Sequence, residues 1–328
     1  MNILLASEKK INLIIQLMNI LITNISRRLY FVDFLVDIKK NFKNLEIHLA
    51  DNDRFSPALN LASTKNHIIP KVSDGKKKYL VAIKKIVKKN KINLIVPITN
   101  FDLEIFSNSK KEFASLNCMI LVSSSKFIKI CLDKKKVSLF CLKNKLKTPK
   151  IYYNLKKTNI NKFYVKKDRF GNTSGGFEKF KKLSSHHFNK KNIVQDLIKG
   201  QEFHFDILND FNGKYVSSCV KRKISMRAGE TDKAKIVYEK KLENICVQIS
   251  NCSNHIGNLD CDVIIDKNND VYILDLNPRF GGGYAFTHLA GLNYLKFIIY
   301  SLSKKKYILP KRPNIIKAAK TLGVKICK

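Results

Sequence analysis

The stretch YILDLNPRFGGGY, residues 272–284, places polar residues at alternate positions of an apolar run and ends in three glycines. Asp275, Asn277 and Arg279 follow one another at every second position. Because successive side chains of a strand point to opposite faces, Asp275 and Asn277 share one face. The chain's formal net charge is +36, so acidic residues are scarce and their placement is informative.

The residues before this stretch predict the partner strand of a hairpin. If Asn268 and Asn269 form a two-residue turn, Asp262 lies directly opposite Asp275. Like charges that face each other destabilise a hairpin unless a cation lies between them. Two carboxylates and the Asn277 amide oxygen are hard ligands suited to Mg²⁺ shared with nucleotide phosphates. A hydrated polar face is the alternative, but the flanking residues are strongly apolar.

Arg279 and the glycines extend this hypothesis. Arg279 continues the alternation and is expected beside the metal, where a transferring phosphoryl group needs positive charge. The glycines Gly281–Gly283 precede a predicted helix, and this position indicates close approach of the backbone to a substrate. A merely flexible turn is the simpler interpretation of the glycines alone.

Composition excludes several classes of protein. With 328 residues and 45% hydrophobic content, the chain can form two or three packed units. Lysine is spread over nearly every segment, and no recognition-helix, zinc-finger or RNA-binding pattern accompanies it, so we expect no dedicated nucleic-acid site. The eight cysteines are scattered without a Cys-x-x-Cys pair, which fits a reducing, cytoplasmic location. The apolar run 11–22 is too short and too polar to span a membrane, so no membrane association is expected.

The first third of the chain alternates strands and helices, which predicts a parallel, doubly wound sheet up to about residue 125. The expected strands are 20–23, 45–50 and 92–99, and the expected helices are 27–39 and 77–90. Residues 1–17 read as an N-terminal extension, or as the result of a start codon assigned too early. From residue 126 the pattern is α+β, with helices expected at 126–146, near 178–190 and at 288–303, and strands at 163–167, 202–208 and 214–220.

Other residues suggest the remainder of a phosphate site. Lys167 ends a strand that leads into the glycine loop 171–176, whose backbone N–H groups can cover phosphate oxygens. Lys134 begins a helix in CLDKKK, residues 131–136. Gly200 and Glu202 offer a backbone edge for a purine and a carboxylate for ribose hydroxyls. Each lysine taken alone is better explained by solvent exposure, so the hypothesis rests on the placement of both lysines together with the acidic hairpin.

Together these stretches resemble the ATP-grasp superfamily, above all its carbamoyl-phosphate-synthase-large-subunit-like and amino-acid-ligase-like members. The similar segments are collinear: MNILITNISRR (18–28), DNDRFSPAL (51–59), LIVPITNFDLEIF (94–106), CLDKKK (131–136), VKKDRFGNTSGG (165–176), VQDLIKGQE (194–202), MRAGE (226–230) and LDLNPRFGGGYAFTHLAG (274–291). The resemblance implies an α/β plus α+β fold, in which a Rossmann-like preATP-grasp domain (18–125) is followed by a two-lobed ATP-grasp domain (126–309). The small lobe would cover about 126–195 and the large lobe about 196–309, before a C-terminal tail (310–328).

The resemblance also implies roles for single residues. Arg279 and Lys167 would be catalytic, with Arg279 steadying an acyl phosphate. ATP would be bound by Lys134, Lys167, Gly171, Ser174, Gly175, Gln195, Leu197, Ile198 and Glu202, and Mg²⁺ (or Mn²⁺) by Asp262, Asp275 and Asn277. Asp168 follows Lys167 where the family usually has proline, so Lys166 is the alternative contact. Gln195 stands where the family commonly has an acidic residue. Asp275 stands where the family more often has glutamate.

The activity implied is ATP-dependent carboxylate–amine ligation through an acyl phosphate, with small-molecule carboxylate and amine substrates and release of ADP and phosphate. Lys223, Arg227 and Glu230 have charges that suit a carboxylate-bearing substrate. The alternatives are carboxyphosphate chemistry of the carbamoyl-phosphate-synthase type and a non-catalytic ATP-binding sensor or scaffold. A homodimer is compatible with the resemblance, since similar proteins often dimerise.

Overall fold

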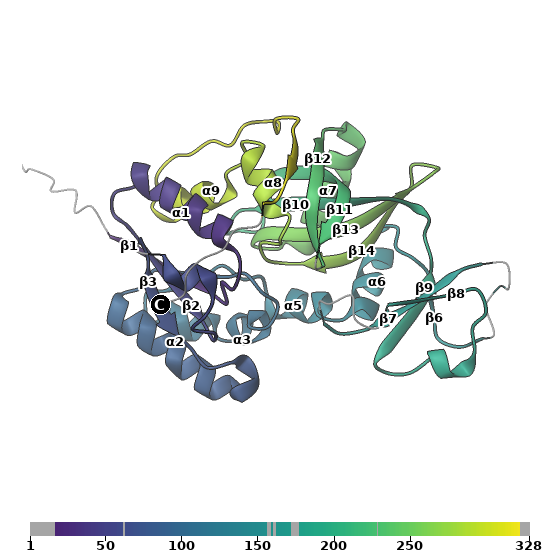
Figure 1. Ribbon diagram of the computed structural model, residues 1–328, viewed down its shortest axis with the longest axis horizontal. Helices are drawn as coiled ribbons and strands as arrows, with labels where there is room; N and C mark the ends of the chain where they lie inside the picture. Colours follow the sequence, from purple (N-terminus) through teal and green to yellow (C-terminus); the bar gives the residue numbers. More distant parts are fainter. Residues whose placement is uncertain are drawn as a thin grey trace, which may run out of the picture.

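The structure, a computed structural model of the chain, describes residues 17–61, 63–155, 159, 162–171, 177–227 and 229–321. These residues form a five-stranded, a four-stranded and a six-stranded sheet (Figure 1). The five-stranded sheet is parallel and the other two are largely antiparallel, which confirms the expected α/β plus α+β class. Residues 1–16, most of the predicted N-terminal extension, lie outside the described part.

The parallel sheet has the strand order β3-β2-β1-β4-β5. Its strands are β1 (Met18–Thr23), β2 (Leu45–Asp51), β3 (Lys65–Ile68), β4 (Leu94–Pro97) and β5 (Met119–Ile120). The connecting helices are α1 (Leu29–Asn41), α2 (Lys76–Asn90), α3 (Leu103–Asn108) and α4 (Lys110–Ala114). Every residue of β1 is buried, as expected for a central strand covered on both faces.

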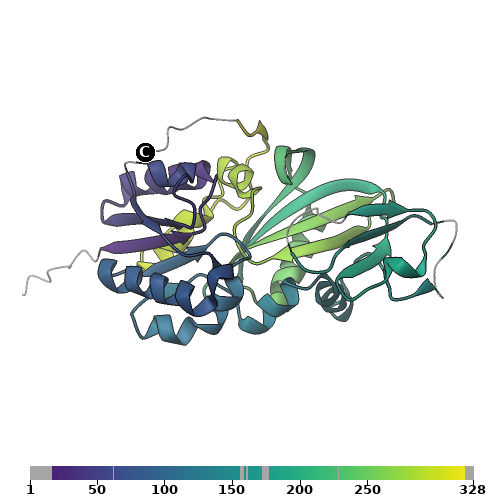
Figure 2. The ribbon, with the colours of Figure 1, turned by 60° about the horizontal axis from the view of Figure 1, so that its bottom comes forward.

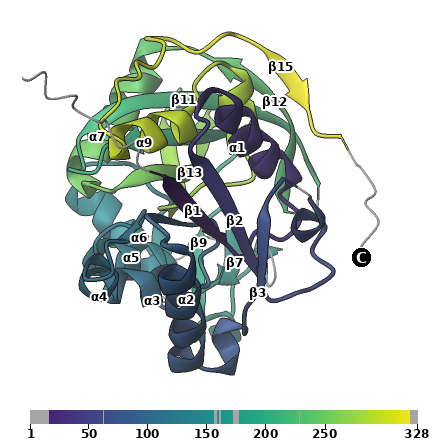
Figure 3. The same cartoon turned by 90° about the vertical axis from the view of Figure 1, so that its left-hand side faces the viewer.

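Different parts of the chain cover the two faces of this sheet. Figure 3 shows α1 and α9 (Tyr294–Leu302) on one side, and α2 and α3 on the other. The first face shares a core with the C-terminal part of the chain, because Ile20 and Phe31 belong to the same buried cluster as Phe280 and Leu295. The parallel sheet and the end of the chain are therefore packed as one body.

The four-stranded sheet has the order β6-β9-β7-β8 and lies at the opposite end of the molecule (Figure 2). Its strands are β6 (Ile151–Tyr152), β7 (Tyr164–Asp168), β8 (Glu178–Phe180) and β9 (Asn192–Asp196). The helix expected near 178–190 is wrong, since this segment holds β8 and a single 3-10 turn, Ser185–His187.

The helix expected over 126–146 is two helices, α5 (Ser125–Cys131) and α6 (Lys134–Lys143). Asp133 separates them, because its side chain accepts a hydrogen bond from Lys135 N at 3.0 Å and so caps α6. Arg169 pairs with the same carboxylate through Nε and Nη2 at 2.8 and 2.7 Å. The break thus fixes the start of α6, where Lys134 lies.

The six-stranded sheet has the order β14-β13-β10-β11-β12-β15. Its strands are β10 (Gly200–Asn209), β11 (Tyr215–Arg227), β12 (Glu230–Val237), β13 (Gly257–Asp266), β14 (Val271–Asn277) and β15 (Lys317–Ala319), with α7 (Lys240–Ser253) packed against it. Residues 317–319, expected in a tail, therefore extend this sheet at β12. The helix expected over 288–303 begins earlier and is divided into α8 (Tyr284–Leu289) and α9, around Gly291 at φ +89°.

The two faces of this sheet differ in chemistry. Phe203, Phe205, Leu259 and Cys261 belong to an apolar core with residues of α5, α6 and α7. Alternate residues of the same strands, among them His204, Asp206, Asp260 and Asp262, point to the opposite face. Among the described helices, none is both long and apolar enough to cross a bilayer.

A buried carboxylate organises the carboxyl edge of the parallel sheet. Asp102 Oδ2 accepts hydrogen bonds from Thr23 Oγ1, Asn24 Nδ2 and Tyr79 OH at 2.6, 2.8 and 3.0 Å. Complete burial raises the pKa of Asp102, although these donors oppose the effect. Asp102 lies two residues after Asn100, and its hydrogen bonds tie the loop that carries Asn100 to β1 and α2.

We expect Asp102→Ala to lower the free energy of unfolding by about 2–4 kcal/mol, because three buried donors lose their acceptor. Asp37→Ala serves as a control, since Asp37 is exposed and its ion pair is with Lys40 on the same helix. Urea denaturation of the two variants and the wild type measures the difference. Equal losses in both variants would contradict a role for the buried carboxylate.

Candidate functional site

The acidic hairpin forms with the predicted pairing but a different turn. Asp262 lies opposite Asp275, and Asp260 lies opposite Asn277. The expected two-residue turn at Asn268-Asn269 is wrong: the loop between the strands spans 267–270, and an irregularity between Asp262 and Val263 restores the pairing. The bulge takes up the extra residue, so the two carboxylates still face each other.

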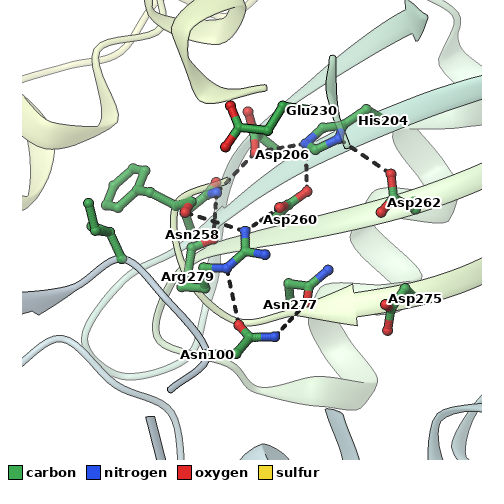
Figure 4. Close-up of polar contacts among 12 residues, drawn as sticks. Asn100, His204, Asp206, Glu230, Asn258, Asp260, Asp262, Asp275, Asn277 and Arg279 are labelled. Carbon is green, nitrogen blue, oxygen red and sulfur yellow. Dashed lines mark hydrogen bonds and ion pairs between the residues drawn. The ribbon is translucent and has the colours of Figure 1, made fainter. Parts of the chain in front are cut away.

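Arg279 is held beside this hairpin by two elements. Its Nε donates to Asn100 Oδ1 at 3.1 Å, and its Nη1 donates to Asp260 Oδ2. Asn100 in turn donates through Nδ2 to Asn277 Oδ1 at 2.9 Å. Figure 4 shows this chain of contacts across the end of β14. Arg279 is therefore fixed between the parallel sheet and the acidic hairpin.

A network of buried charges lies behind Arg279. His204 Nε2 lies 2.7 Å from Asp260 Oδ1, and His204 Nδ1 lies 3.6 Å from Asp262 Oδ1 (Figure 4). Lys221, fully buried, donates to Asp206 Oδ2 and to Thr287 Oγ1, the latter at 2.8 Å. Although burial opposes it, the charges of Asp260 and Asp206 raise the pKa of His204 to about 10. His204 is therefore an imidazolium at neutral pH.

Two sets of side chains could be considered for a cation. His204, Asp206 and Asp260 lie close enough to share one. That set does not favour a metal, because both carboxylates already have cationic partners, Lys221 and Arg279.

The predicted set of Asp262, Asp275 and Asn277 fits a metal better. Burial raises the pKa of Asp275, although Lys134 and Lys167 oppose the effect. Asp275 forms no ion pair within 4 Å among the described residues, whereas Asp262 accepts from Lys223 Nζ at 2.7 Å. A partly buried carboxylate that faces another and lacks a paired cation is suited to a divalent ion with oxygen ligands.

The three glycines leave room for the protein's own side chains. A Cβ on Gly281 would lie 1.9 Å from Asp260 Oδ2, and one on Gly282 would lie 2.5 Å from Glu230 Cδ. A Cβ on Gly283 would lie 2.9 Å from His204 Nε2. The close approach predicted for this loop is thus an approach to the charged face of the six-stranded sheet.

The two candidate lysines of β7 point in opposite directions. Lys166 Nζ pairs with Glu178 Oε1 at 2.8 Å on β8. Lys167 points to the other face, toward the site. Burial lowers the pKa of Lys167 to about 8, although the nearby charges of Asp275 and Asp262 oppose the effect. Of the two, Lys167 faces the acidic hairpin.

Lys134 contacts the residues that directly follow β7. Lys134 Nζ donates to the Gly171 carbonyl at 2.7 Å, and Lys134 N donates to the Arg169 carbonyl at 3.0 Å. Ser174 and Gly175, predicted to contact ATP, lie outside the described residues.

The residues predicted at the adenine and ribose follow β9 and begin β10. Gln195 is buried in β9, and Leu197 N donates to the Phe163 carbonyl at 2.9 Å, so this N–H is not free for a base. Ile198 follows Leu197 between the two strands. The Glu202 side chain is 53% exposed and lies 3.5 Å from Lys223 Nζ.

The three predicted substrate residues are not equivalent. Lys223 pairs with Asp262 and Glu202, and Arg227 Nη2 donates to Asp232 Oδ2 at 2.9 Å. Of the three, Glu230 is the residue that lies against Gly282. Lys320 and Arg28 lower the pKa of Glu230, although burial opposes them.

Comparison with known families agrees with this arrangement. Residues 20–121 match the family model of the PylC-like N-terminal domain, and residues 131–283 match that of the ATP-grasp domain. The second match contains the loop 171–176, the acidic hairpin, Arg279 and the glycines 281–283. The chain belongs to the ATP-grasp superfamily.

Solved structures of ATP-grasp proteins have the same fold at low identity. Biotin carboxylase from Campylobacter jejuni is 16% identical with a TM-score of 0.70, over 90% of this chain and 72% of that one. N5-carboxyaminoimidazole synthetase from Staphylococcus aureus is 14% identical with a TM-score of 0.67, over 91% and 80%. L-amino acid ligase from Bacillus licheniformis is 14% identical with a TM-score of 0.63, over 87% and 74%. No curated protein matches the sequence.

Sequence reasoning missed several residues of this ATP-grasp site. His204, Asp206 and Asp260 alternate within the apolar strands β10 and β13, which is the same signal that identified Asp275 and Asn277. Applied to EFHFDIL and LDCDV, it would have found them. Asn100 has no comparable signal, since it lies in a loop and reaches Arg279 only through the packing of two domains.

We expect Gly281→Ala to destabilise this ATP-grasp protein by about 2 kcal/mol or more, because the added Cβ overlaps the Asp260 carboxylate. The double variant Gly281→Ala/Asp260→Ala is the matched test, since truncating Asp260 removes the overlapping atoms. Its loss in free energy of unfolding should be smaller than the sum of the two single losses. Additive losses would contradict the contact.

Proposed function

We propose that the chain is an ATP-dependent carboxylate–amine ligase that uses an acyl-phosphate intermediate. The observation that carries the proposal is that Arg279 bonds to Asp260, two residues before Asp262 of the opposed pair Asp262 and Asp275, with Lys134 and Lys167 close enough to influence Asp275. ATP-grasp membership and the likeness to structures of a carboxylase, a synthetase and an amino acid ligase support it.

In this proposal each residue has a limited task. Asp262, Asp275 and Asn277 would hold Mg²⁺, which neutralises charge on the β- and γ-phosphates when bound. Lys167 and Lys134 would contact the phosphates from the small lobe, and the loop 171–176 would cover them. Gln195, Leu197, Ile198 and Glu202 would line the nucleoside. Since the Leu197 N–H already donates to the Phe163 carbonyl, Leu197 would contribute its own carbonyl to the base.

The chemistry follows from charge placement. A substrate carboxylate oxygen attacks the γ-phosphorus, the bond to the bridging oxygen breaks, and ADP leaves with the electron pair. Arg279, whose position is fixed by Asp260 and Asn100, would stabilise charge on the acyl phosphate. The amine nitrogen then attacks the acyl carbon, phosphate leaves, and the nitrogen loses a proton. This sequence requires no nucleophilic side chain.

The proposal is tested by phosphate release from Mg-ATP with pairs drawn from amino acids, hydroxy acids, bicarbonate and simple amines. We expect release that depends on one carboxylate and one amine, and a loss of at least about a hundredfold in Asp275→Asn. Asp270→Asn is the matched control, because Asp270 lies in the hairpin turn and pairs with Lys147.

The outcomes separate the alternatives. Release that requires bicarbonate would favour carboxyphosphate chemistry. ATP binding without release by any pair would favour a sensor or scaffold. An Asp275→Asn variant as active as the wild type would contradict the metal assignment.

We also expect Mg-ATP affinity to fall by about three- to tenfold between pH 7 and pH 9. The pKa of Lys167, at about 8, means that its positive charge is present below this pH and lost above it. Titration of ATP binding against pH in Lys167→Gln should lack this decline. Lys166→Gln, which removes a lysine paired with Glu178, should keep it.

A further inference from the structure

A second polar cluster lies where the parallel-sheet domain meets β12 and the C-terminal strand. We call it the α1 cluster: Arg28, Tyr30, Glu230 and Lys320. Lys320 Nζ donates to Glu230 Oε2 at 2.8 Å, and Arg28 Nη2 lies 3.6 Å from Glu230 Oε1. Lys320 Nζ also lies 5.6 Å from the centre of the Tyr30 ring. The cluster therefore joins the start of α1 to the edge of the six-stranded sheet.

Two buried donors of the α1 cluster lack an acceptor. Within the described part of the chain, the Tyr30 hydroxyl and Arg28 Nε are shielded from solvent and form no hydrogen bond. Buried polar groups normally have partners, because an unmet donor costs free energy. These two donors indicate a place where an acceptor belongs to a ligand.

The charge of the α1 cluster also favours an anion. Arg28 and Lys320 share the single carboxylate of Glu230, so one positive charge is in excess. Helix α1 begins at this point without a side-chain cap and without an acidic residue in its first turn. The helix itself therefore supplies no negative charge to its positive end, and the nearby carboxylate is that of Glu230.

The α1 cluster adjoins the proposed reaction centre. Glu230 lies against Gly282, while Gly281 lies against Asp260 and Arg279. In the segment 281–283, Gly282 thus contacts the α1 cluster, and the preceding residue, Gly281, contacts Asp260 and Arg279. The Glu230 side chain is 42% exposed, so its carboxylate can also accept from a ligand.

We propose that the α1 cluster binds the carboxylate of the amine-supplying substrate, which is therefore an amino acid. The Tyr30 hydroxyl and Arg28 Nε donate to that carboxylate, Lys320 adds positive charge, and Glu230 accepts a hydrogen bond from the amino group. This inference rests on the ligase function proposed above and specifies the class of its amine substrate.

The test is calorimetric titration of the full chain, in the presence of Mg-ADP, with the standard amino acids, the carboxamide of each one that binds, and phosphoethanolamine. We expect at least one amino acid to bind about tenfold or more tightly than its carboxamide. In Tyr30→Phe that amino acid should bind about three- to tenfold more weakly. Its thermal stability should be unchanged or higher, because the lost hydroxyl has no partner in the protein.

Lys317→Gln is the matched control for Lys320→Gln, since Lys317 is exposed on β15 three residues before Lys320. Lys320→Gln should weaken binding and Lys317→Gln should not. Equal binding of acid and carboxamide, unchanged binding in Tyr30→Phe, preference for phosphoethanolamine, or no amino acid bound would each overturn the inference. Amino-acid binding without any phosphate release would leave it standing and count against the ligase function instead.

Discussion

The structure around the site depends on Asp260, a buried carboxylate that carries two cations. Arg279 bonds to one of its oxygens and His204 lies against the other. Burying such groups is costly unless each charge is paired, and removing one partner leaves the others uncompensated. The close approach at Gly281, the raised pKa of His204 and the orientation of Arg279 each depend in part on the position of this side chain. No apolar replacement could keep these three features together.

The main features of the fold were predictable because they rest on local patterns. The continuous apolar strands β1 and β4 indicate a parallel sheet, and the alternation in β14 places Asp275 and Asn277 on one face. Alternation survives errors in the loops: the turn at 267–270 differs from the prediction, yet Asp262 still faces Asp275. Periodicity constrains the face of a residue more strongly than the length of a connection.

The features that were missed depend on contacts between distant segments. Asn100 bonds to Arg279 from another domain, and Lys320 reaches Glu230 only because residues 317–319 join the edge of β12. Helix ends were missed for a related reason. Asp133 caps α6, and its side chain is held by Arg169, which lies directly after β7 and far from Asp133 in the sequence. No window of neighbouring sequence contains such information.

The shared core between the parallel sheet and helices α8 and α9 has a consequence for motion. Because Phe31, Phe280 and Tyr284 pack in one cluster, the hairpin end that carries Arg279 cannot shift without the first domain. The four-stranded sheet has only a small core of its own around Tyr152, Tyr164 and Val194. Any relative movement within the site therefore falls to that sheet, and the separation of Lys167 from Asp275 is the distance that such a movement would change.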